Sequence, residues 1–240
     1  MRARINFSNL DGKKISYDYQ YKLASVIYRK LGERSPEIAE KQHSKHGSRI
    51  YTFSGLLSDK VDLKPDGIVF HEGYFVISSP DSELISNAVE SFLDKPLFEI
   101  SGEKVAGRFE VEKAEVLKPP VIGNEGTFRT LSPVYLKTIR QVANTKKEFD
   151  LFPNEPKFYE RLHFNLISKF ELFYNRKPVD HFDTLGIHET KTKRVKIGDT
   201  YRRCSLLKIT FEGSQELLKF AYDAGIGEKT AMGFGCLDIL

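Results

Sequence analysis

The chain has 240 residues, of which 40% are apolar and 29% charged, and its formal net charge is +4 at pH 7. This length suits two domains of about 100–150 residues, and the apolar content is sufficient for a buried core in each. No run of about 18 apolar residues could cross a membrane, and the N-terminal residues lack the apolar stretch of a secretory signal. The only two cysteines, Cys204 and Cys236, form no CxxC pair, which argues against a disulfide framework and a thiolate zinc site. We therefore expect a soluble, cytoplasmic protein.

The positive charge is concentrated in the second half of the chain. Residues 1–120 contain 18 basic and 18 acidic side chains, so the whole excess lies in 121–240. Five basic residues and no acid occur over 126–147, and seven basic residues accompany Asp199 alone over 190–208. Each run by itself fits an ordinary solvated surface, but two such stripes in one half are typical of a face that binds a polyanion.

The first half has the periodicity of a β-α-β-β-α-β unit with one additional short helix. A helix is predicted over 19–31, with Leu23 and Ile27 on its apolar stripe and its end at Gly32. A second helix with strong apolar periodicity follows Ser79-Pro80. Strands are predicted over 2–7, 49–53, 68–78, 98–100 and 109–117, and the short helix over 35–47.

The second half repeats this order after a linker rich in proline and glycine, predicted at 119–126. The predicted domains are therefore 1–118 and 127–240. The second comprises strands around 127–139, a helix over 156–173, two long strands on either side of 197–199, a helix after Ser214 and a final strand over 234–240. Two such units define an α+β fold of tandem ferredoxin-like (RRM-like) β-α-β-β-α-β domains. That fold serves many functions, so it does not specify one.

A glycine-rich loop precedes the last strand and reads GIGEKTAMGFG over 225–235. Four glycines in eleven positions are expected to expose backbone N–H groups and to let a phosphate chain approach closely. The sequence fits neither a Walker loop nor a dinucleotide-binding fingerprint, and both of those connect a strand to a following helix. This loop instead follows a helix, which disfavours a mononucleotide site. A tight structural connection is the alternative.

This loop, directly before a terminal strand, resembles the signature loop of the CRISPR-associated endoribonucleases that cut precursor CRISPR transcripts within each repeat. The two ferredoxin-like units, the chain length and the acid-free segment TFRTLSP at 127–133 match that family too. The resemblance therefore extends over nearly the whole chain, with the loop as its most specific part.

The resemblance implies RNA cleavage without a metal or another cofactor. The 2′-hydroxyl of the substrate attacks the adjacent phosphate and leaves a 2′,3′-cyclic phosphate and a 5′-hydroxyl. Such a reaction needs a base, an acid and a cation. Histidine suits proton transfer because its pKa lies near neutrality, and arginine or lysine can stabilise the charge that develops on the phosphorus.

The resemblance also implies which residues act. A Tyr on the first helix, a His after the short helix and a basic residue six positions on correspond here to Tyr28, His43 and Arg49. Tyr28 lies roughly 125° from the centre of the apolar stripe of its helix, so it is not expected in the core. His46 is the alternative to His43 as the catalytic histidine. Arg49 stands where the family usually has lysine, and arginine cannot readily donate its proton. No third ligand follows the two histidines at a recognised spacing, so no metal site is predicted.

Basic residues near the tip of the two long strands, together with the acid-free stretch and the glycine loop, are predicted to contact RNA phosphates. The aromatic run over 73–77 is similar to a base-stacking motif, but alternating core packing explains it better. The predicted RNA-binding residues are Lys193, Arg194, Lys196 and Arg202 on the hairpin, Arg129, Lys137 and Arg140 in the acid-free stretch, and Gly225, Gly227, Lys229, Gly233 and Gly235 in the loop.

The predicted partner is CRISPR repeat RNA, both as precursor and as mature guide RNA. Attachment to an interference complex and formation of a homodimer are open. Two other functions are compatible with the sequence. One is a non-catalytic CRISPR repeat RNA-binding protein of the same fold, and the other is a ferredoxin-like enzyme whose glycine loop holds a small phosphate.

Overall fold

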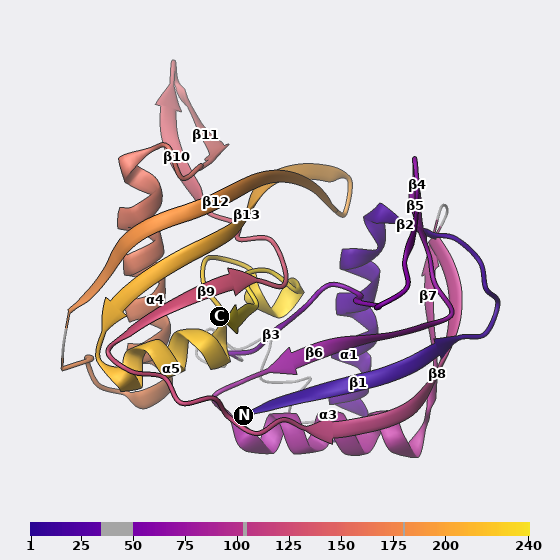
Figure 1. The fold of residues 1–240 in the computed structure, drawn as a ribbon. Helices are drawn as coiled ribbons and strands as arrows, with labels where there is room; N and C mark the ends of the chain where they lie inside the picture. The colour runs from indigo at the N-terminus through magenta and orange to yellow at the C-terminus, as the bar shows by residue number, and fades with distance from the viewer. Residues whose placement is uncertain (35–49, 103–104, 180) are drawn as a thin grey trace.

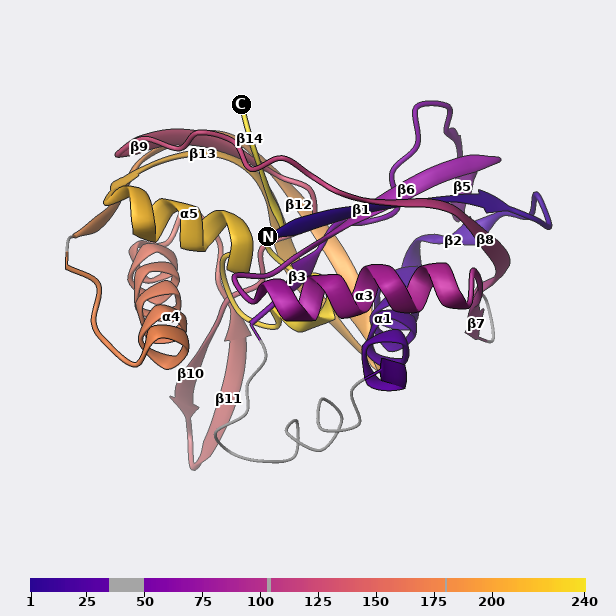
Figure 2. The same cartoon turned by 90° about the horizontal axis from the view of Figure 1, so that it is seen from below.

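Two large antiparallel β-sheets, each covered on one face by a pair of helices, form the body of the protein (Figures 1 and 2). The computed structural model describes residues 1–34, 50–102, 105–179 and 181–240. The first half of the chain forms one sheet and the second half the other. The α+β fold of two tandem ferredoxin-like units that the sequence predicts is confirmed.

In the first half, β1 (Arg2–Asn9) is the central strand. It pairs antiparallel with β6 (Glu72–Ser78) on one side and with β8 (Val105–Val116) on the other. β3 (Thr52–Phe53) extends the sheet beyond β6, and β7 (Leu97–Gly102) extends it beyond β8. The order β3-β6-β1-β8-β7 contains the two split β-α-β units of a ferredoxin-like fold.

The helices α1 (Gln20–Arg34) and α3 (Ser82–Asp94) cover one face of this sheet (Figure 2). A single 3₁₀ turn, η1 (Tyr17–Tyr19), leads into α1. The predicted end of the first helix at Gly32 is wrong, because α1 continues to Arg34. Lys30 in this last stretch is buried and its ammonium lies 5.6 Å from the centre of the Phe92 ring on α3. Tertiary contacts thus override the weak helix propensity of the glycine.

A small second sheet in the first half was not predicted. It consists of β2 (Ile15–Ser16), β5 (Gly67–Val69) and β4 (Asp62–Lys64), in the order β2-β5-β4. The single strand predicted over 68–78 is therefore wrong, because the chain turns between β5 and β6 and places them in different sheets.

The second half follows the ferredoxin-like order β12-β13-β9-β14. β12 (Phe182–Ile197) and β13 (Thr200–Gly213) form a long hairpin, β13 pairs with β9 (Glu125–Thr130), and β9 pairs with the last strand, β14 (Leu237–Ile239). All these pairs are antiparallel. The residues between β8 and β9 form neither helix nor strand, and the division of the chain at 119–126 stays a prediction.

The helices α4 (Pro156–Tyr174) and α5 (Gln215–Ala224) cover one face of the second sheet (Figure 2). α5 begins as predicted at Ser214, whose hydroxyl accepts a hydrogen bond from the N–H of Leu217. This N-cap satisfies one of the free N–H groups at the helix start. The loop after α5 contains the 3₁₀ turn η3 (Thr230–Met232).

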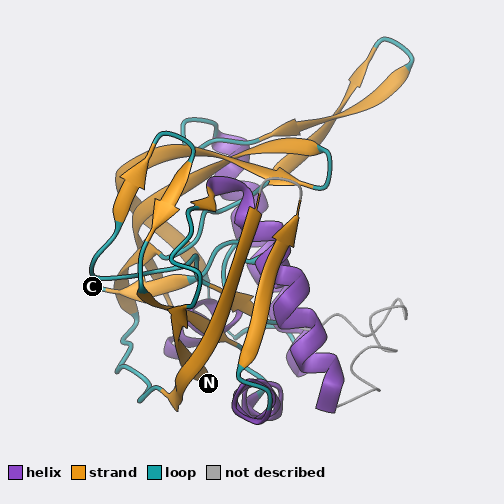
Figure 3. Cartoon of the chain, turned by 90° about the vertical axis from the view of Figure 1, so that its right-hand side faces the viewer, coloured by secondary structure: helices purple, strands orange, loops and turns teal. Residues whose placement is uncertain are grey.

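A two-stranded arm, β10 (Lys137–Val142) and β11 (Thr145–Asp150), is inserted between β9 and α4 and projects from the second half (Figures 1 and 3). The strands predicted around 127–139 correspond to β9 and the start of β10, but the arm itself was not predicted. The sheet strand ends at Thr130, and Val134 forms only an isolated bridge to Ser205. No helix of the described residues has the length and apolarity needed to cross a membrane.

The two halves are joined by a buried arginine. Arg2 of β1 is 4% exposed, and its guanidinium stacks on the Tyr222 ring at 3.5 Å. It donates hydrogen bonds to the carbonyl of Tyr222 (2.5 Å) and to the carbonyl of Leu237 (2.6 Å), at the end of α5 and in β14. A buried charge that lost these partners would be costly, so the contact fixes one half against the other.

Candidate functional site

The glycine loop, residues 225–235, connects α5 to β14 and lies between the two halves. All four of its glycines are buried, and each has a positive φ, between 67° and 82°. Such backbone angles are unfavourable for residues that carry a Cβ. The glycines are therefore required by the path of the chain, whatever else the loop does.

The loop contacts the start of the first half directly. Thr52 donates a 2.8 Å hydrogen bond from its hydroxyl to the carbonyl of Phe234. Gln20, the first residue of α1, donates from its amide to the carbonyl of Gly233. A side chain at Gly233 would collide with Gln20 and with the ring of Phe53. The loop is thus a joint between the halves, and sequence reasoning did not identify Gln20 or Thr52 as parts of it.

The expectation that the glycines expose their N–H groups is wrong for three of them. The N–H groups of Gly225, Gly233 and Gly235 donate to carbonyl oxygens within the protein, at 3.0, 2.8 and 2.9 Å. A Cβ on Gly235 would also overlap the backbone of Ile226. Protein packing therefore accounts for these glycines, because backbone groups that are buried need partners.

Lys229 is the exposed residue at the turn of this loop. It has a left-handed backbone conformation, with φ 58°, and directly precedes η3. Its neighbour Glu228 is held in place, because its backbone N–H donates to the carbonyl of Tyr135 at 2.8 Å and its carboxylate accepts from Arg161 of α4 at 3.2 Å. Of the five loop residues predicted to bind RNA, Lys229 alone presents a charge to solvent.

Lys169 of α4, which was not among the predicted site residues, supports the glycine loop through hydrogen bonds to its backbone. Lys169 of α4 donates from its ammonium to the carbonyl of Gly225 (2.5 Å), where α5 ends, and to that of Gly227 (3.3 Å). Burial lowers the pKa of Lys169 to about 7. Its neighbours Arg161 and Asn165 precede it at intervals of four residues, so the three share one face of α4. The sequence did contain a signal for this polar face, because these polar residues repeat at helical spacing in a helix otherwise rich in aromatic residues.

Tyr28 is half-buried on α1, in agreement with the prediction that it lies outside the core. It follows Gln20 by two turns, which places it about 12 Å further along the helix and roughly 80° around it. Ala24, between them, is buried on the same side. The helix that contacts the glycine loop therefore also carries the predicted catalytic tyrosine.

His43, His46 and Arg49 lie outside the described residues, as does the short helix predicted over 35–47. The described chain resumes at Ile50, which is buried in the core of the second half. The carbonyl of Ile50 accepts a 2.6 Å hydrogen bond from the Ser79 hydroxyl. The chain then enters β3 at Thr52, the residue bonded to the glycine loop.

The long β12–β13 hairpin has two different faces. On its outer face, the guanidinium of Arg194 lies 4.3 Å from the centre of the Tyr201 ring, and the ammonium of Lys196 lies 6.0 Å from it. No carboxylate among the described residues pairs with either cation. The Tyr201 hydroxyl donates to Asp18 at 3.2 Å, which holds the hairpin tip against the start of α1 (Figure 1).

On its inner face, the hairpin packs on the glycine loop. Val195 and Cys204 are buried beside Tyr135 and Phe234 of the loop region. Lys193, opposite Cys204, is half-buried, and burial lowers its pKa. The strand alternation therefore separates Lys193 from Arg194 and Lys196, which the sequence analysis had treated as one cluster.

The remaining predicted RNA-binding cations form ion pairs. Arg129 pairs with Asp238 at 2.7 Å, and Arg140 pairs with Glu155 at 3.0 Å. Glu148 pairs with both Lys137 and Arg202, which lowers the pKa of this carboxyl, chiefly through the hydrogen bond from Lys137. These cations are less available to a phosphate than Arg194, Lys196 and Lys229 unless the carboxylates give way.

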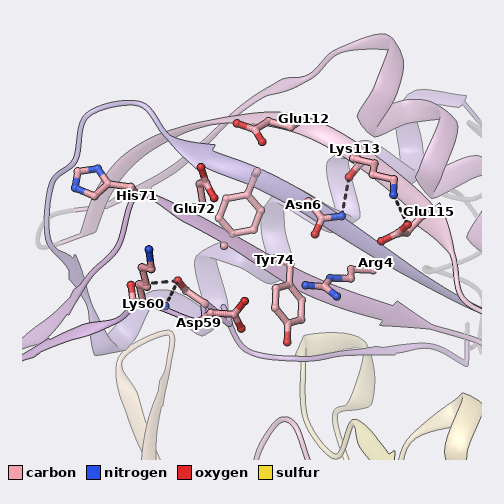
Figure 4. Close-up of a pocket in the computed structure, with 13 residues that line it drawn as sticks. Arg4, Asn6, Asp59, Lys60, His71, Glu72, Tyr74, Glu112, Lys113 and Glu115 are labelled. Atoms are coloured by element: carbon pink, nitrogen blue, oxygen red, sulfur yellow. Dashed lines mark hydrogen bonds and ion pairs between the residues drawn. The ribbon is translucent and has the colours of Figure 1, made fainter.

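The open face of the first sheet carries a polar pocket of about 670 Å³ (Figure 4). The guanidinium of Arg4 stacks on the ring of Tyr74 at 3.6 Å. Lys113 pairs with Glu115 at the other side, and further carboxylates make the lining mixed in charge. Phe75 and Ile77 of β6 belong to the core of the first half, as the prediction of core packing requires, but Val76 on the opposite face is buried as well, so the strand does not alternate strictly.

Comparisons with known proteins fit this arrangement. The profile for the N-terminal part of CRISPR-associated protein Cas6 matches residues 14–114, and that for its C-terminal part matches 117–239. CRISPR-associated endoribonuclease Cas6 1 of Methanocaldococcus jannaschii is 36% identical over 238 residues, which cover 98% of this chain and 91% of that protein. A CRISPR-associated endoribonuclease-like protein Cas6 of Pyrococcus furiosus is 32% identical over 244 residues, covering 100% and 99%.

A solved structure described as "An RAMP protein binding different RNA substrates" superposes with a TM-score of 0.90 at 29% identity, covering 100% of this chain and 99% of that one. Two ferredoxin-like units joined by a buried glycine loop thus place the chain among the tandem ferredoxin-like CRISPR-associated proteins. Within that class, it belongs to the Cas6 family. The described residues contain no group of three or more side chains suited to a metal.

Proposed function

We propose that this chain is an endoribonuclease that cuts precursor CRISPR transcripts within the repeat and so produces mature guide RNA. The observation that carries the proposal is the contact of the glycine loop with α1, through Gln20 and the carbonyl of Gly233. It sets the exposed Lys229 and the basic hairpin tip beside the helix that carries Tyr28. The relative in Methanocaldococcus jannaschii, a named endoribonuclease, supports the activity, and the solved RNA-binding relative supports the substrate class. The prediction of a cytoplasmic location belongs with this proposal.

The chemistry uses the nucleophile of the substrate. The 2′-oxygen forms a bond to the adjacent phosphorus, and its proton passes to a base on the protein. The bond from phosphorus to the 5′-oxygen breaks, and this oxygen takes a proton to become a 5′-hydroxyl, while the other product ends in a 2′,3′-cyclic phosphate. Holding the 2′-oxygen in line with the breaking bond contributes a large share of the rate.

His43 is the proposed proton-transfer residue, with His46 as its competitor. Arg49 would stabilise the negative charge that builds up on the phosphate oxygens, and Tyr28 would orient the reacting groups by hydrogen bonding. Lys229, Arg194 and Lys196 are the proposed primary phosphate contacts. Phosphates could replace the present carboxylate partners of Arg129, Lys137, Arg140 and Arg202, while Lys193 and the glycines would act through the packing of the hairpin and the loop.

The decisive experiment incubates the protein with a precursor that contains the cognate repeat, in EDTA, and analyses the product ends. We expect cleavage at one position, with a cyclic phosphate on one fragment and a 5′-hydroxyl on the other. A single 2′-deoxy substitution at the cleaved position should abolish the reaction, because it removes the nucleophile. Cleavage of the deoxy substrate would contradict the mechanism.

His43→Ala and His46→Ala, compared in parallel, identify the histidine. We expect His43→Ala to lower the single-turnover rate by about 10²-fold or more, the usual contribution of a general acid or base, with little change in RNA affinity. His46→Ala should remain close to the wild type. If the rates are reversed, His46 takes the role.

A non-catalytic RNA-binding protein of the same fold is the second candidate. Two observations favour it: arginine stands at position 49, and one of two relatives in Pyrococcus furiosus is named endoribonuclease-like, although the other is named an endoribonuclease. Tight binding of the repeat without any cyclic-phosphate product would select this function. Arg49→Lys, which restores a cation able to donate its proton, would then be expected to increase cleavage.

A further inference from the structure

The arm formed by β10 and β11 has a surface that the protein itself does not use. Most of its side chains are exposed, and 59% of the surface of Ile139 is open to solvent. A two-stranded hairpin on its own is at best marginally stable in water. Because this arm packs on little besides its own base, its outer surface is available for a partner (Figure 3).

A groove of about 530 Å³ runs between the arm and the start of α4. We call it the arm groove, and its floor and walls are formed by Lys137 and Ile139 of β10 and by Lys157, Arg161 and Phe164 of α4. Glu160 is the one carboxylate in its lining. Lys137 and Arg161 pair with Glu148 and Glu228, so Lys157 is the cation of this lining that stays available to an anionic ligand.

The groove contains hydrogen-bond donors that the protein leaves unused. Lys157 is exposed and pairs with no carboxylate among the described residues. The Nε of Arg161 is buried and has no hydrogen-bond partner in the described part of the chain. A phosphate oxygen is an acceptor that fits the exposed Lys157 ammonium, through a charge-assisted hydrogen bond, whereas the buried Nε of Arg161 reaches such an oxygen only after its side chain moves.

An exposed aromatic ring lies beside these cations. Phe164 is 62% exposed, and the guanidinium of Arg161 lies 5.5 Å from its ring centre. Basic side chains interleaved with exposed aromatic rings are characteristic of surfaces that bind single-stranded nucleic acid, where unpaired bases stack on the rings. The volume of about 530 Å³ is in the range of a small-molecule site, which accommodates about one or two nucleotides.

The arm groove is continuous with the glycine loop. Arg161 donates to Glu228 at 3.2 Å, and the backbone N–H of Lys137 donates to the same carboxylate at 3.5 Å. Lys229, the exposed cation of the loop, is the next residue. A strand that contacts Lys229 therefore reaches the groove past the half-buried Glu228, whose carboxylate is paired with Arg161.

We infer that the arm groove binds a single-stranded segment of the RNA beyond the cleavage site, with a base on Phe164 and a phosphate between Lys157 and Arg161. The inference rests on the proposed function because RNA is taken as the ligand. It concerns binding, however, and does not depend on cleavage. It adds Lys157, Arg161 and Phe164 to the residues that the sequence indicated.

The test compares two double variants of the full chain. Lys157→Ala with Phe164→Ala removes a cation and a ring from the groove, and Leu172→Ala with Lys177→Ala removes an exposed apolar side chain and an exposed cation at and just beyond the far end of α4. Affinity is measured by fluorescence anisotropy at several salt concentrations, with a precursor RNA and with the same RNA shortened from either end. Photocrosslinking with 5-bromouridine identifies the peptide that contacts the RNA.

We expect the groove variant to bind the precursor about tenfold more weakly, with a salt dependence lower by about one phosphate contact, and the control variant to bind normally. Shortening the segment that occupies the groove should remove the difference between variant and wild type. Crosslinks should map to the α4 peptide.

Equal affinity of the groove variant and the wild type would overturn the inference, as would an equal loss in the control. Loss of a protein partner with unchanged RNA binding would overturn it too, and would assign the groove to a protein surface. If the wild type fails to cleave but the groove variant still loses affinity, the proposed function fails and the inference stands.

Discussion

The glycine loop and the β12–β13 hairpin lie in opposite environments, although the sequence predicts RNA contact for both. The glycines of the loop are buried, adopt positive φ angles and have no room for a side chain. On the outer face of the hairpin, Arg194 and Lys196 have no ion-pair partner among the described residues. The comparison teaches that the residues of a recognisable motif, here the glycines, can shape a binding site while other residues, here the hairpin cations, are the ones available to contact RNA.

The largest effect is expected from a side chain at Gly235. Gly235→Ala combines an unfavourable φ of 67° with an overlap on the Ile226 backbone, so we expect the free energy of unfolding to fall by about 3 kcal/mol or more. Gly198→Ala is the matched control. Gly198, at the hairpin turn, has a φ of 58° but nothing within 4 Å of an added Cβ, so it should cost only about 1 kcal/mol. Urea denaturation measures both, and equal stabilities would mean that the loop is not a packed joint.

Removing the outer cations of the hairpin should change affinity without changing stability. Arg194→Ala with Lys196→Ala is expected to weaken repeat RNA binding about tenfold and to lower the salt dependence by one to two phosphate contacts. The free energy of unfolding should stay within about 0.5 kcal/mol of the wild type, as for most exposed substitutions. Lys95→Ala, at the exposed end of α3, serves as the control. Unchanged RNA affinity in the double variant would remove the hairpin from the binding surface.

The smallest effect concerns Lys169, which joins α4 to the loop. Its pKa is about 7 in the folded protein and well above that in the unfolded chain, so the unfolded chain binds more protons between these values. The stability of the folded state should therefore rise with pH from about 7 to 8.5, by at most about 1.4 kcal/mol per pH unit. Near pH 8.5, where thiols titrate in the unfolded chain, the raised pKa values of the buried cysteines act in the opposite direction, so we expect the rise to flatten there.

Lys169→Met isolates this contribution. The variant keeps an unbranched side chain of similar length but has no ionisable group, so its stability should not show the rise between pH 7 and 8.5. The difference between the two pH profiles is the measurement. A parallel rise in the variant would assign the pH dependence to another group.

Local patterns predicted the helices well. The apolar spacing after Ser79-Pro80 predicted α3, in which Leu84, Ala88 and Phe92 are all buried. Helical periodicity depends on neighbours within one or two turns, which the sequence contains directly. The helix end predicted at Gly32 is wrong because the contact of Lys30 with α3 supports the last turn of α1.

The arm escaped prediction for a different reason. Its strands have no buried face, so they lack the apolar alternation that identifies a strand. The groove beside it escaped as well, because Lys137 and Phe164 come from elements that only the tertiary structure brings together. Lys169 was missed because the repeat of polar residues along α4 does not by itself show that this helix face meets the loop.

The sequence by itself determined the two ferredoxin-like units and the place of the glycine loop, because periodicity, caps and turn residues act over short distances along the chain. Only the tertiary structure decided what the glycines are for. Their missing side chains make room for Thr52 and Phe53, about 180 residues earlier in the chain, and their carbonyls accept from Gln20 and Lys169. Contacts of that kind depend on how two packed halves meet, and no local pattern records the outcome.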